Sequence, residues 1–391
     1  MSRARRPRER PGDAPSLVGS EWVLEVGPVA HGGHCVARHC GQVVFVRHAL
    51  PGERVRARVT EGRAGDRFVR ADAVEVLGAS PHRVERPCRY AVPGGCGGCD
   101  LQHVAPTHQR ELKAAVVREQ FARLAGLDVD VEVAPVPGDR DGLRWRTRVE
   151  FAVDASGRAG LHAHRSGRVV PLEDCLVATE KVIASTVLDT DWSGVRAVDV
   201  VDAAHPEDAV LVPVGGTAGD GGGRVGEVAR DGDWVGEYAL AARGFWQVHR
   251  GAATTLLTRV MAQLDVRAGD RVLDLYAGAG LFTMRLGELV GPTGAVLGIE
   301  GDRQAVSDGI ANCAGLPAVE WRAGPVHRHL AGLAARGVTA DLAVLDPPRA
   351  GAGSRVVAAL AAMRPRRIVY VACDPATLAR DVRTFAAHGY R

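Results

Sequence analysis

The sequence predicts an α/β protein with three folded parts: a small N-terminal β-barrel, a central α+β domain and a doubly wound parallel sheet. Two observations lead to this prediction. Short β-rich runs separated by Gly and Pro turns fill residues 17–78, which is typical of small barrels. From about residue 245, apolar strand-like runs alternate with helical segments, which is the pattern of a parallel sheet covered by helices.

We divide the 391 residues into four parts where this pattern changes. Residues 1–15 are expected to form a disordered basic arm and residues 16–78 the barrel. Residues 79–244 form the expected central domain and residues 245–391 the doubly wound sheet. The barrel is OB-like, a shape that often binds oligonucleotides, although a fold alone establishes no binding.

The charge of the chain gives little support for a large nucleic-acid surface. The net charge is +3, and the arm at residues 1–15 accounts for all of it, with five arginines against two acidic residues. Any such surface must therefore be a local patch. No apolar run is long enough to span a membrane, and the N-terminus has no secretory h-region. We expect a cytoplasmic protein.

Four of the eight cysteines have the spacing of metal ligands. Cys88, Cys96, Cys99 and Cys175 form a C-x7-C-x2-C-x75-C set. In a reducing compartment such clusters indicate metal binding rather than disulfides. Four thiolates suit either a [4Fe–4S] cluster or a structural Zn²⁺. Three bunched cysteines with one remote favour the [4Fe–4S] cluster, although spacing alone leaves Zn open.

The central part contains a helix and an arginine-rich segment. Apolar residues recur near helical spacing at about 106–126. In LRWRTRVEFAV, Arg144, Arg146 and Arg148 alternate with apolar residues, which would put three guanidinium groups on one face of a strand. That face is either solvated or a stripe that contacts phosphates. Residues 215–232 are rich in Gly and predict a flexible loop or hairpin tip.

The candidate strands after residue 245 are RVLDLYA, AVLGIE, AVEWRA, LAVLD and IVYVA. The first ends in a glycine-rich turn, where Gly278 and Gly280 let the backbone approach a ligand. Thr283 stands where the dinucleotide fingerprint requires a third glycine, so the fit to NAD is poor. Asp274 suits the ammonium of a methionine moiety. Glu300 suits ribose hydroxyls. Together they predict a binding site for S-adenosylmethionine (SAM) and a class I SAM-dependent methyltransferase fold.

Two further motifs follow at the ends of later strands. Asp346 begins the stiff turn DPPRAG, and Cys373 lies 27 residues further on, after IVYVA. In open α/β sheets the carboxyl ends of the strands form the active-site crevice, so both residues are expected there. A thiolate that adds to C6 of a pyrimidine turns C5 into a nucleophile for a methyl group. We therefore interpret Cys373 as a nucleophile rather than as a core residue.

These motifs resemble the RNA uracil-C5 methyltransferases that form 5-methyluridine, and in particular the 23S rRNA branch with a TRAM domain and a [4Fe–4S] cluster. VVFVRHALPGERVRARV resembles the TRAM barrel, and CGGCDLQH with Cys88 and Cys175 resembles the cluster motif. DPPRAG and YVACDPATLARD resemble the active-site turn and the nucleophile motif. The resemblance implies the nucleophile Cys373, the metal ligands named above, and SAM contacts from Gln247, Tyr276, Gly278, Gly280, Leu281, Glu300 and Asp346.

One departure from the family concerns the base that removes the C5 proton. The family has a Glu for this step some tens of residues after the nucleophile, whereas the sequence ends 18 residues after Cys373. The closing antiparallel strands of the sheet are absent as well. We expect an incomplete record or a C-terminally truncated chain. We also expect the IVYVA strand to lie at an exposed edge and turnover to be slow.

Three functions remain to be compared. The first is methylation of uridine C5 in RNA, with rRNA preferred to tRNA as the substrate because of the TRAM and cysteine segments. The second is a non-catalytic RNA-binding protein that keeps the barrel and the cluster. The third, a NAD-linked oxidoreductase, lacks the third glycine. The expected partner is RNA, and the chain is expected to act as a monomer without a membrane.

Overall fold

The computed structural model describes residues 14–216 and 222–391. All but the last two residues of the predicted basic arm lie outside this part of the chain. The contacts divide the chain into two compact units, which are described separately. Unit 1 comprises residues 1–116 and 162–170, and unit 2 comprises residues 117–161 and 171–391.

Unit 1 contains the predicted small barrel. Its five strands pair in the order β1-β4-β5-β3-β2, and the two end strands meet where the rings of Trp22 and His39 stack at 4.4 Å. Alternate residues point inward, as the pattern of Val55, Ala57 and Val59 on β4 shows, and they form the barrel core. The strands are β1 (Glu21–Glu25), β2 (Cys35–His39), β3 (Gln42–Arg47), β4 (Arg54–Glu61) and β5 (Phe68–Gly78).

The predicted helix at 106–126 is confirmed, with a change of geometry near its end. It is α1 (Pro106–Gln120), followed by a π-helical turn at Phe121–Ala125. Gly126 adopts φ +70° and ends the turn, as glycine commonly does after a helix. In unit 2, β6 (Arg148–Val153), β7 (Ala159–His162), β9 (Ala197–Val201) and β10 (Val210–Val214) then form an antiparallel sheet in the order β10-β9-β6-β7. The short elements of this region are β8 (Val169–Pro171) and α2 (Glu180–Ala184).

The Gly-rich segment at 215–232, expected to be a flexible loop or hairpin tip, lies partly outside the described residues, and its second half differs from this expectation. From Arg224 onward it is a strand, β11 (Arg224–Asp231), paired in register with β12 (Trp234–Ala241). Within it Val225, Glu227 and Ala229 alternate with more exposed residues, so a period of two was hidden by the neighbouring glycines. The hairpin is attached to the rest of unit 2 by ion pairs from Arg224 to Asp308 and from Arg285 to Asp231.

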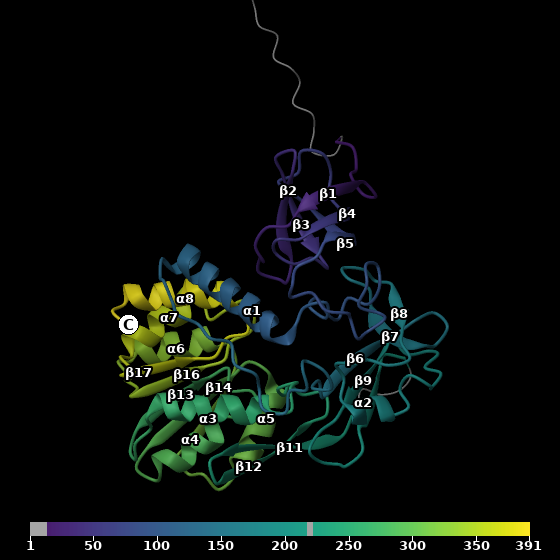
Figure 1. Ribbon diagram of the computed structural model, residues 1–391. Helices are drawn as coiled ribbons and strands as arrows, with labels where there is room; N and C mark the ends of the chain where they lie inside the picture. The colour runs from purple at the N-terminus through teal and green to yellow at the C-terminus, as the bar shows by residue number, and fades with distance from the viewer. Residues whose placement is uncertain (1–13, 217–221) are drawn as a thin grey trace, which may run out of the picture. The chain divides into compact units, whose positions relative to one another are not determined.

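The doubly wound sheet is confirmed, and all five predicted strands are present. They pair in parallel in the order β15-β14-β13-β16-β17. As Figure 1 shows, α3, α4 and α5 cover one face and α6, α7 and α8 cover the other. The strands are β13 (Arg271–Leu275), β14 (Ala295–Glu300), β15 (Val319–Ala323), β16 (Leu342–Leu345) and β17 (Arg367–Tyr370). The helices are α3 (Ala252–Leu264), α4 (Thr283–Val290), α5 (Arg303–Asn312), α6 (Val326–Ala335), α7 (Ser354–Ala362) and α8 (Pro375–Ala387).

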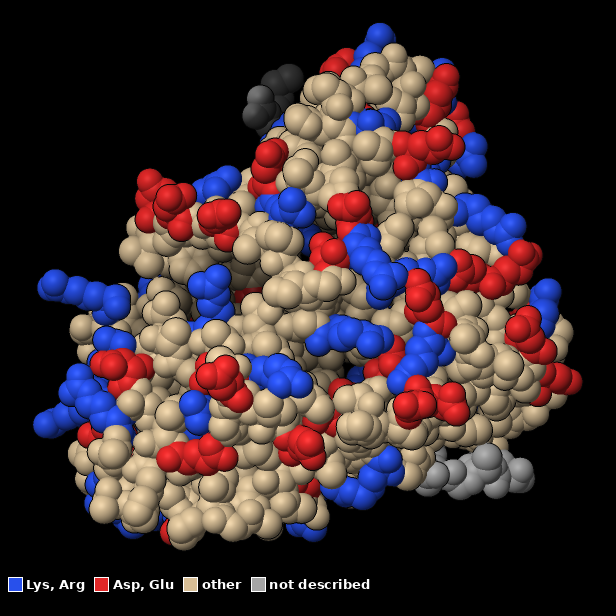
Figure 2. Space-filling view, turned by 60° about the horizontal axis from the view of Figure 1, so that its bottom comes forward, with Lys and Arg blue, Asp and Glu red and all other residues tan. Residues whose placement is uncertain are grey.

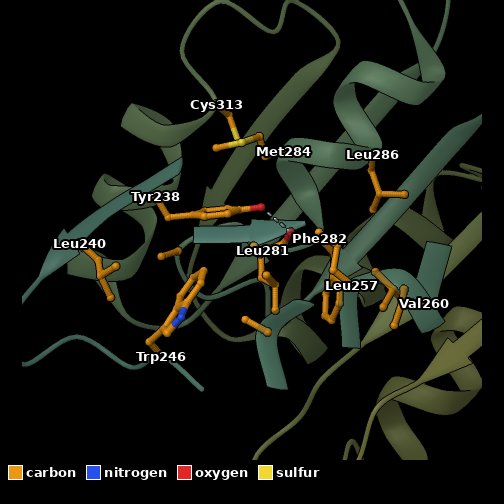
Figure 3. Packing of buried hydrophobic residues seen from close by; sticks show 14 of the residues in the cluster. Tyr238, Leu240, Trp246, Leu257, Val260, Leu281, Phe282, Met284, Leu286 and Cys313 are labelled. Atoms are coloured by element: carbon orange, nitrogen blue, oxygen red, sulfur yellow. Dashed lines mark hydrogen bonds between the residues drawn. The ribbon is translucent and has the colours of Figure 1, made fainter. Parts of the chain in front are cut away.

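Alternation along the strands supplies two separate cores. Val272 and Val344 face the core on the α3–α4 side, whereas Leu273 and Leu345 face the core on the α6–α8 side. In the first core, the hydroxyl of Tyr238 donates to the carbonyl of Leu281 at 3.0 Å (Figure 3). In the described part of the chain β17 pairs only with β16, as expected for the strand at the edge of the sheet.

The predicted arginine strand is wrong in its first half, because β6 begins only at Arg148. Arg144 has φ +53° and forms two hydrogen bonds with Asp174, at 2.7 and 2.9 Å. Arg148 pairs with the buried carboxylate of Glu227 at 2.7 Å and donates to the carbonyls of Ala242 and Gly244. Arg144 and Arg148 therefore link segments within unit 2, and Arg146 donates to the carbonyl of Arg148 at 3.0 Å, so the three arginines do not form the predicted stripe along one strand.

Among the described residues, no helix combines the length and the apolar character needed to cross a bilayer. On the face drawn in Figure 2, acidic and basic side chains are interspersed. This mixture agrees with the near-neutral charge of the sequence after residue 15.

The ion pair between Arg148 and Glu227 leads to a prediction about stability. Arg148→Ala leaves the buried carboxylate of Glu227 without its charged partner and two carbonyls without their donor, so we expect the free energy of unfolding to fall by about 3 kcal/mol. Arg158→Ala is the matched control, because Arg158 forms an exposed ion pair with Asp154 and should cost less than about 1 kcal/mol. Urea unfolding of both variants measures the difference, and equal losses would contradict the structural role of Arg148.

Candidate active site

The parallel register brings the ends of β13, β16 and β17 to one edge of the sheet. Leu275 pairs with Leu345, and Leu345 pairs with Tyr370. The residues that follow these three positions therefore meet at the same carboxyl edge, where doubly wound folds bind their ligands. The ends of β14 and the glycine-rich turn lie at this edge as well, because Leu275 also pairs with Ile299.

The glycine-rich turn after β13 has the conformation that only glycine adopts without strain. Gly278 has φ +57° and Gly280 has φ +94°. A Cβ at Gly278 would meet no atom within 4 Å, so a ligand can approach the backbone there. A Cβ at Gly280 would lie 3.3 Å from the ring of Trp321, which packs beneath the turn. The cradle fits a cofactor that is bound by backbone groups.

Glu300 stands at the end of β14 and faces this turn. Its Oε2 accepts the N–H of Gly278 at 3.0 Å, and its Oε1 accepts the N–H of Asp302 at 2.8 Å. These bonds fix the orientation of the carboxylate, and each oxygen keeps a second acceptor site. A fixed carboxylate beside a glycine turn is the arrangement that holds a ribose.

Asp274 has a different place from the one expected. Its carboxyl is only 1% exposed and accepts the hydroxyl of Thr283 at 2.5 Å. Burial, with smaller contributions from the charges of Asp346 and Glu300, raises its pKa to about 7. A buried group of this kind is not placed for the expected contact with a cofactor ammonium. It holds the first turn of α4 against β13 instead.

Three other predicted cofactor contacts lie around the turn. Tyr276 follows β13 with φ +62°, and burial raises its pKa to about 12. Leu281 follows Gly280, with its side chain in the core and its carbonyl bound to Tyr238. Gln247 follows Trp246, which packs in the same core as Leu281 (Figure 3).

Asp346 and Cys373 follow the paired strands β16 and β17. The N–H of Asp346 donates to the carbonyl of Leu275 at 3.2 Å, and the N–H of Val371 donates to the carbonyl of Leu345 at 2.8 Å. Burial raises the pKa of Asp346 to about 6. Cys373 is exposed. The fold thus brings the predicted nucleophile and the predicted carboxylate to the same edge as the glycine turn.

The sequence reasoning missed Phe245, which precedes Trp246 in the same loop. Phe245 is 72% exposed, the largest value among the exposed large apolar side chains of the described residues, whereas Trp246 is buried. Two adjacent aromatic residues are a signal that could have been used. In an extended segment neighbouring side chains point to opposite sides, so one ring can be buried while the other faces the solvent. An exposed ring two residues from Gln247 suits stacking on a base.

The cysteine segment belongs to unit 1, except for Cys175, which is buried in unit 2. The Sγ of Cys96 accepts the N–H of Gly98 at 3.3 Å, and the Sγ of Cys99 accepts the side-chain amide of Gln102 at 3.2 Å. Hydrogen bonds of this kind tune thiolates that bind iron–sulfur clusters. Within residues 14–216 and 222–391, however, no three His, Cys, Asp or Glu side chains are grouped as metal ligands.

A second concave site lies in unit 1, between the barrel and residues 163–168. Its volume is about 730 Å³. Glu61 forms ion pairs with Arg70 and with Arg165, and Arg47 pairs with Asp100. Four arginines against two acidic residues leave the lining basic. The lining residues are Arg47, Thr60, Glu61, Arg70, Ala71, Asp72, Gly94, Ala163, His164, Arg165, Ser166 and Arg168.

The fold and the site define a class I SAM-dependent methyltransferase with an N-terminal TRAM domain, whose family matches residues 15–74. An uncharacterized RNA methyltransferase of Streptomyces coelicolor is 48% identical, over 96% of this chain and 89% of its own length. The 23S rRNA (uracil(1939)-C(5))-methyltransferase RlmD of Pseudomonas putida is 33% identical, with the same coverage of 96% and 89%. The chain belongs to this family of RNA methyltransferases.

A solved structure agrees with the fold. The tRNA (uracil-54, C5)-methyltransferase of Pyrococcus abyssi, in complex with S-adenosyl-L-homocysteine, covers 92% of both chains with a TM-score of 0.65 and 21% identity. This likeness confirms the predicted fold class, and the two curated relatives confirm the prediction of an RNA methyltransferase. The oxidoreductase alternative is not supported.

The raised pKa of Asp274 predicts how stability depends on pH. The folded protein keeps a proton up to about pH 7, whereas the unfolded chain loses it near the ordinary value of 3.8. Stability therefore falls as the pH rises through this interval. In Asp274→Asn the amide oxygen can still accept the hydroxyl of Thr283, and the side chain no longer titrates. The variant should therefore not lose stability as the pH rises through this interval. In urea unfolding, the free energy of unfolding of the variant should rise relative to that of the wild type between about pH 4.5 and pH 7.5. A difference between the two proteins that is constant with pH would contradict the raised pKa of Asp274.

Proposed function

We propose that the protein methylates C5 of a uridine in RNA, most specifically in 23S rRNA, through a covalent adduct between Cys373 and C6. The observation that supports this best is the shared edge, where Cys373 and Asp346 follow strands paired in register beside the glycine turn. Cys373 is an exposed thiol just past the end of a parallel strand, at the edge where such sheets bind their ligands, and this position suits a nucleophile.

SAM supplies the methyl group when it is bound. Gly278 and Gly280 would leave room for its methionine moiety, and Glu300 would accept the ribose hydroxyls. Gln247, Tyr276, Leu281 and Asp346 complete the proposed contacts. Leu281 would contribute through its backbone, because its side chain is buried in the core.

The proposed reaction begins when the Cys373 thiolate forms an Sγ–C6 bond, which moves negative charge to C5 and O4 of the uracil. C5 then takes the methyl group from the sulfonium sulfur of SAM, and the S–CH₃ bond breaks with its electron pair left on sulfur as a thioether. Loss of the C5 proton, which without a dedicated base passes slowly to water, then lets the Sγ–C6 bond break with return of the electron pair to sulfur. Burial keeps part of the Asp346 carboxyl protonated near neutral pH. Its proton could therefore be donated to O4 as charge develops there.

The target uridine has to leave its stack to reach an edge thiol, so loops and single strands are the expected substrates. Phe245 is suited to stack on a neighbouring base, because its ring is exposed in the loop that carries Gln247. The 33% identity to RlmD supports 23S rRNA as the substrate. The tRNA enzyme shares the fold, which alone does not decide between the two RNAs.

A covalent trap tests the nucleophile. RNA that contains 5-fluorouridine has no C5 proton to lose after methylation, so the Cys373–C6 bond should persist and slow the RNA on a denaturing gel. Cys373→Ala should abolish the adduct, and Cys40→Ala, which removes another exposed cysteine, should keep it. An adduct that survives in the Cys373→Ala protein, with calorimetric SAM binding unchanged, would exclude this mechanism.

We also propose that Cys88, Cys96, Cys99 and Cys175 hold a [4Fe–4S] cluster, with Zn as the alternative. The support is their spacing and the N–H···S bonds to Cys96 and Cys99. The methyl transfer has no redox step, so the cluster would shape the protein or orient RNA. The proposed cytoplasmic location agrees with this ligand set, and we propose a monomer with the domain boundaries expected from the sequence.

The metal is tested by analysis of the purified protein. We expect iron and sulfide in equal amounts and loss of both in Cys99→Ser. Cys313→Ser is the control and should keep them, since Cys313 lies in the core of unit 2. Stoichiometric zinc without iron would contradict the [4Fe–4S] cluster and support a zinc site.

The basic pocket in unit 1 is proposed to take RNA phosphates. Arg165 is 53% exposed and shares Glu61 with Arg70, so it can turn to a phosphate. Arg165→Ala should weaken RNA binding and reduce the slope of log K against log salt by about 1. Arg54→Ala is the matched control, because Arg54 is a similarly exposed barrel arginine paired with Glu25. Equal effects of the two changes in a filter-binding titration would contradict a specific role for the pocket.

A further inference from the structure

Asp381 joins the segments around the proposed catalytic pair. It lies on α8, eight residues after Cys373, and is only 5% exposed. Its carboxylate accepts the N–H of Ala352 at 2.8 Å and the N–H of Gly353 at 3.2 Å. It also accepts the hydroxyl of Tyr370 at 2.7 Å. Three donors from two other segments therefore converge on one buried carboxylate.

The first of these segments is the loop that follows Asp346. Gly351 has φ +80°, and a Cβ there would lie 2.8 Å from Oδ2 of Asp381. The loop can pass this close only because position 351 is glycine. Its next two N–H groups point at the carboxylate, and Gly353 then starts α7. Asp381 thus fixes the loop that leads away from Asp346.

The second segment is the end of β17. Tyr370 lies three residues before Cys373, and its hydroxyl accepts the N–H of Ala352 at 3.0 Å while it donates to Asp381. Burial raises the pKa of Tyr370, and the carboxylate of Asp381 adds to the rise, so this hydroxyl stays a donor. On the other side of Cys373, Asp374 caps α8 by accepting the N–H of Thr377 at 2.9 Å.

We propose that Asp381 is a positioning residue for the methyl transfer, because its carboxylate fixes the Asp346 loop, the strand end before Cys373 and the helix after Cys373 in one geometry. It touches neither substrate in this role. The proposal rests on the proposed function of Cys373 and Asp346. It extends that function by naming the group that sets the distance between them.

Asp381→Asn tests the proposal with little change in volume. An amide has one acceptor oxygen and a donor NH₂, so it cannot accept from Ala352, Gly353 and Tyr370 together. Asp270→Asn is the matched control. Asp270 is likewise a buried carboxylate that bridges two segments, since it pairs with Arg366 at 2.7 Å, but it lies at the opposite, amino edge of the same sheet.

We expect Asp381→Asn to slow formation of the 5-fluorouridine adduct in single turnover by about 100-fold, the usual scale for a small displacement of reacting groups. Calorimetric SAM affinity should fall much less than this rate, because the glycine turn and Glu300 lie on other strands and only Asp346, among the proposed SAM contacts, adjoins the loop that Asp381 fixes. Asp270→Asn should lower the melting temperature but should not slow formation of the adduct. Tyr370→Phe should give an intermediate rate.

Hydrogen exchange provides a readout that does not depend on the proposed function. Asp381→Asn should speed exchange of the amides in 350–353 and in 371–374 together, whereas Asp270→Asn should leave both unchanged. If wild type forms no adduct but this exchange pattern appears, the proposed function fails and the positioning contacts stand. Unchanged exchange, or an adduct rate within about threefold of wild type, would overturn the role of Asp381.

Discussion

The parallel pairing of β13, β16 and β17 is the constraint on which the rest of the site depends. Because Leu275, Leu345 and Tyr370 lie side by side in register, the glycine turn, Asp346 and Cys373 emerge at a common edge. A slip of one residue would reverse which side chains face each core. The two apolar cores that cover this sheet therefore hold the chemistry in register as well as the fold.

Buried carboxyl groups at this edge serve different purposes according to their partners. Asp274 accepts from Thr283 and stays inside, whereas Glu300 accepts backbone N–H groups and remains at the rim. Asp346 is partly buried, and burial raises its pKa. Asp381 accepts three donors and ties separate segments together. The hydrogen-bond donors around each carboxyl group therefore determine whether it has a structural role or faces a ligand. Its position in the sequence does not determine this.

Much of the architecture could be predicted from periodicity. All five parallel strands and the helix at 106–126 are present where the apolar pattern indicated them, because each buries a face of fixed period. The errors arose where local signals competed. Glycines near 220 hid the alternation of β11, and the alternating arginines imitated a strand through Arg144, which has a left-handed backbone instead. The positions of Arg144 and Arg148 depend on ion pairs with Asp174 and Glu227, which lie far away in the sequence. Residue spacing within a short segment cannot predict such partners.

The sequence by itself determined the elements, the glycine turn, the order of the motifs and the resemblance to RNA methyltransferases, because these depend on residue type and short spacing. Only the tertiary structure decided which carboxyl groups are buried, which member of the Phe245–Trp246 pair is exposed, and that Asp381 reaches the loop after Asp346. Each of these depends on contacts between residues far apart in the chain. Such contacts are fixed by packing and by the need to satisfy buried donors, which act only once the sheet has formed.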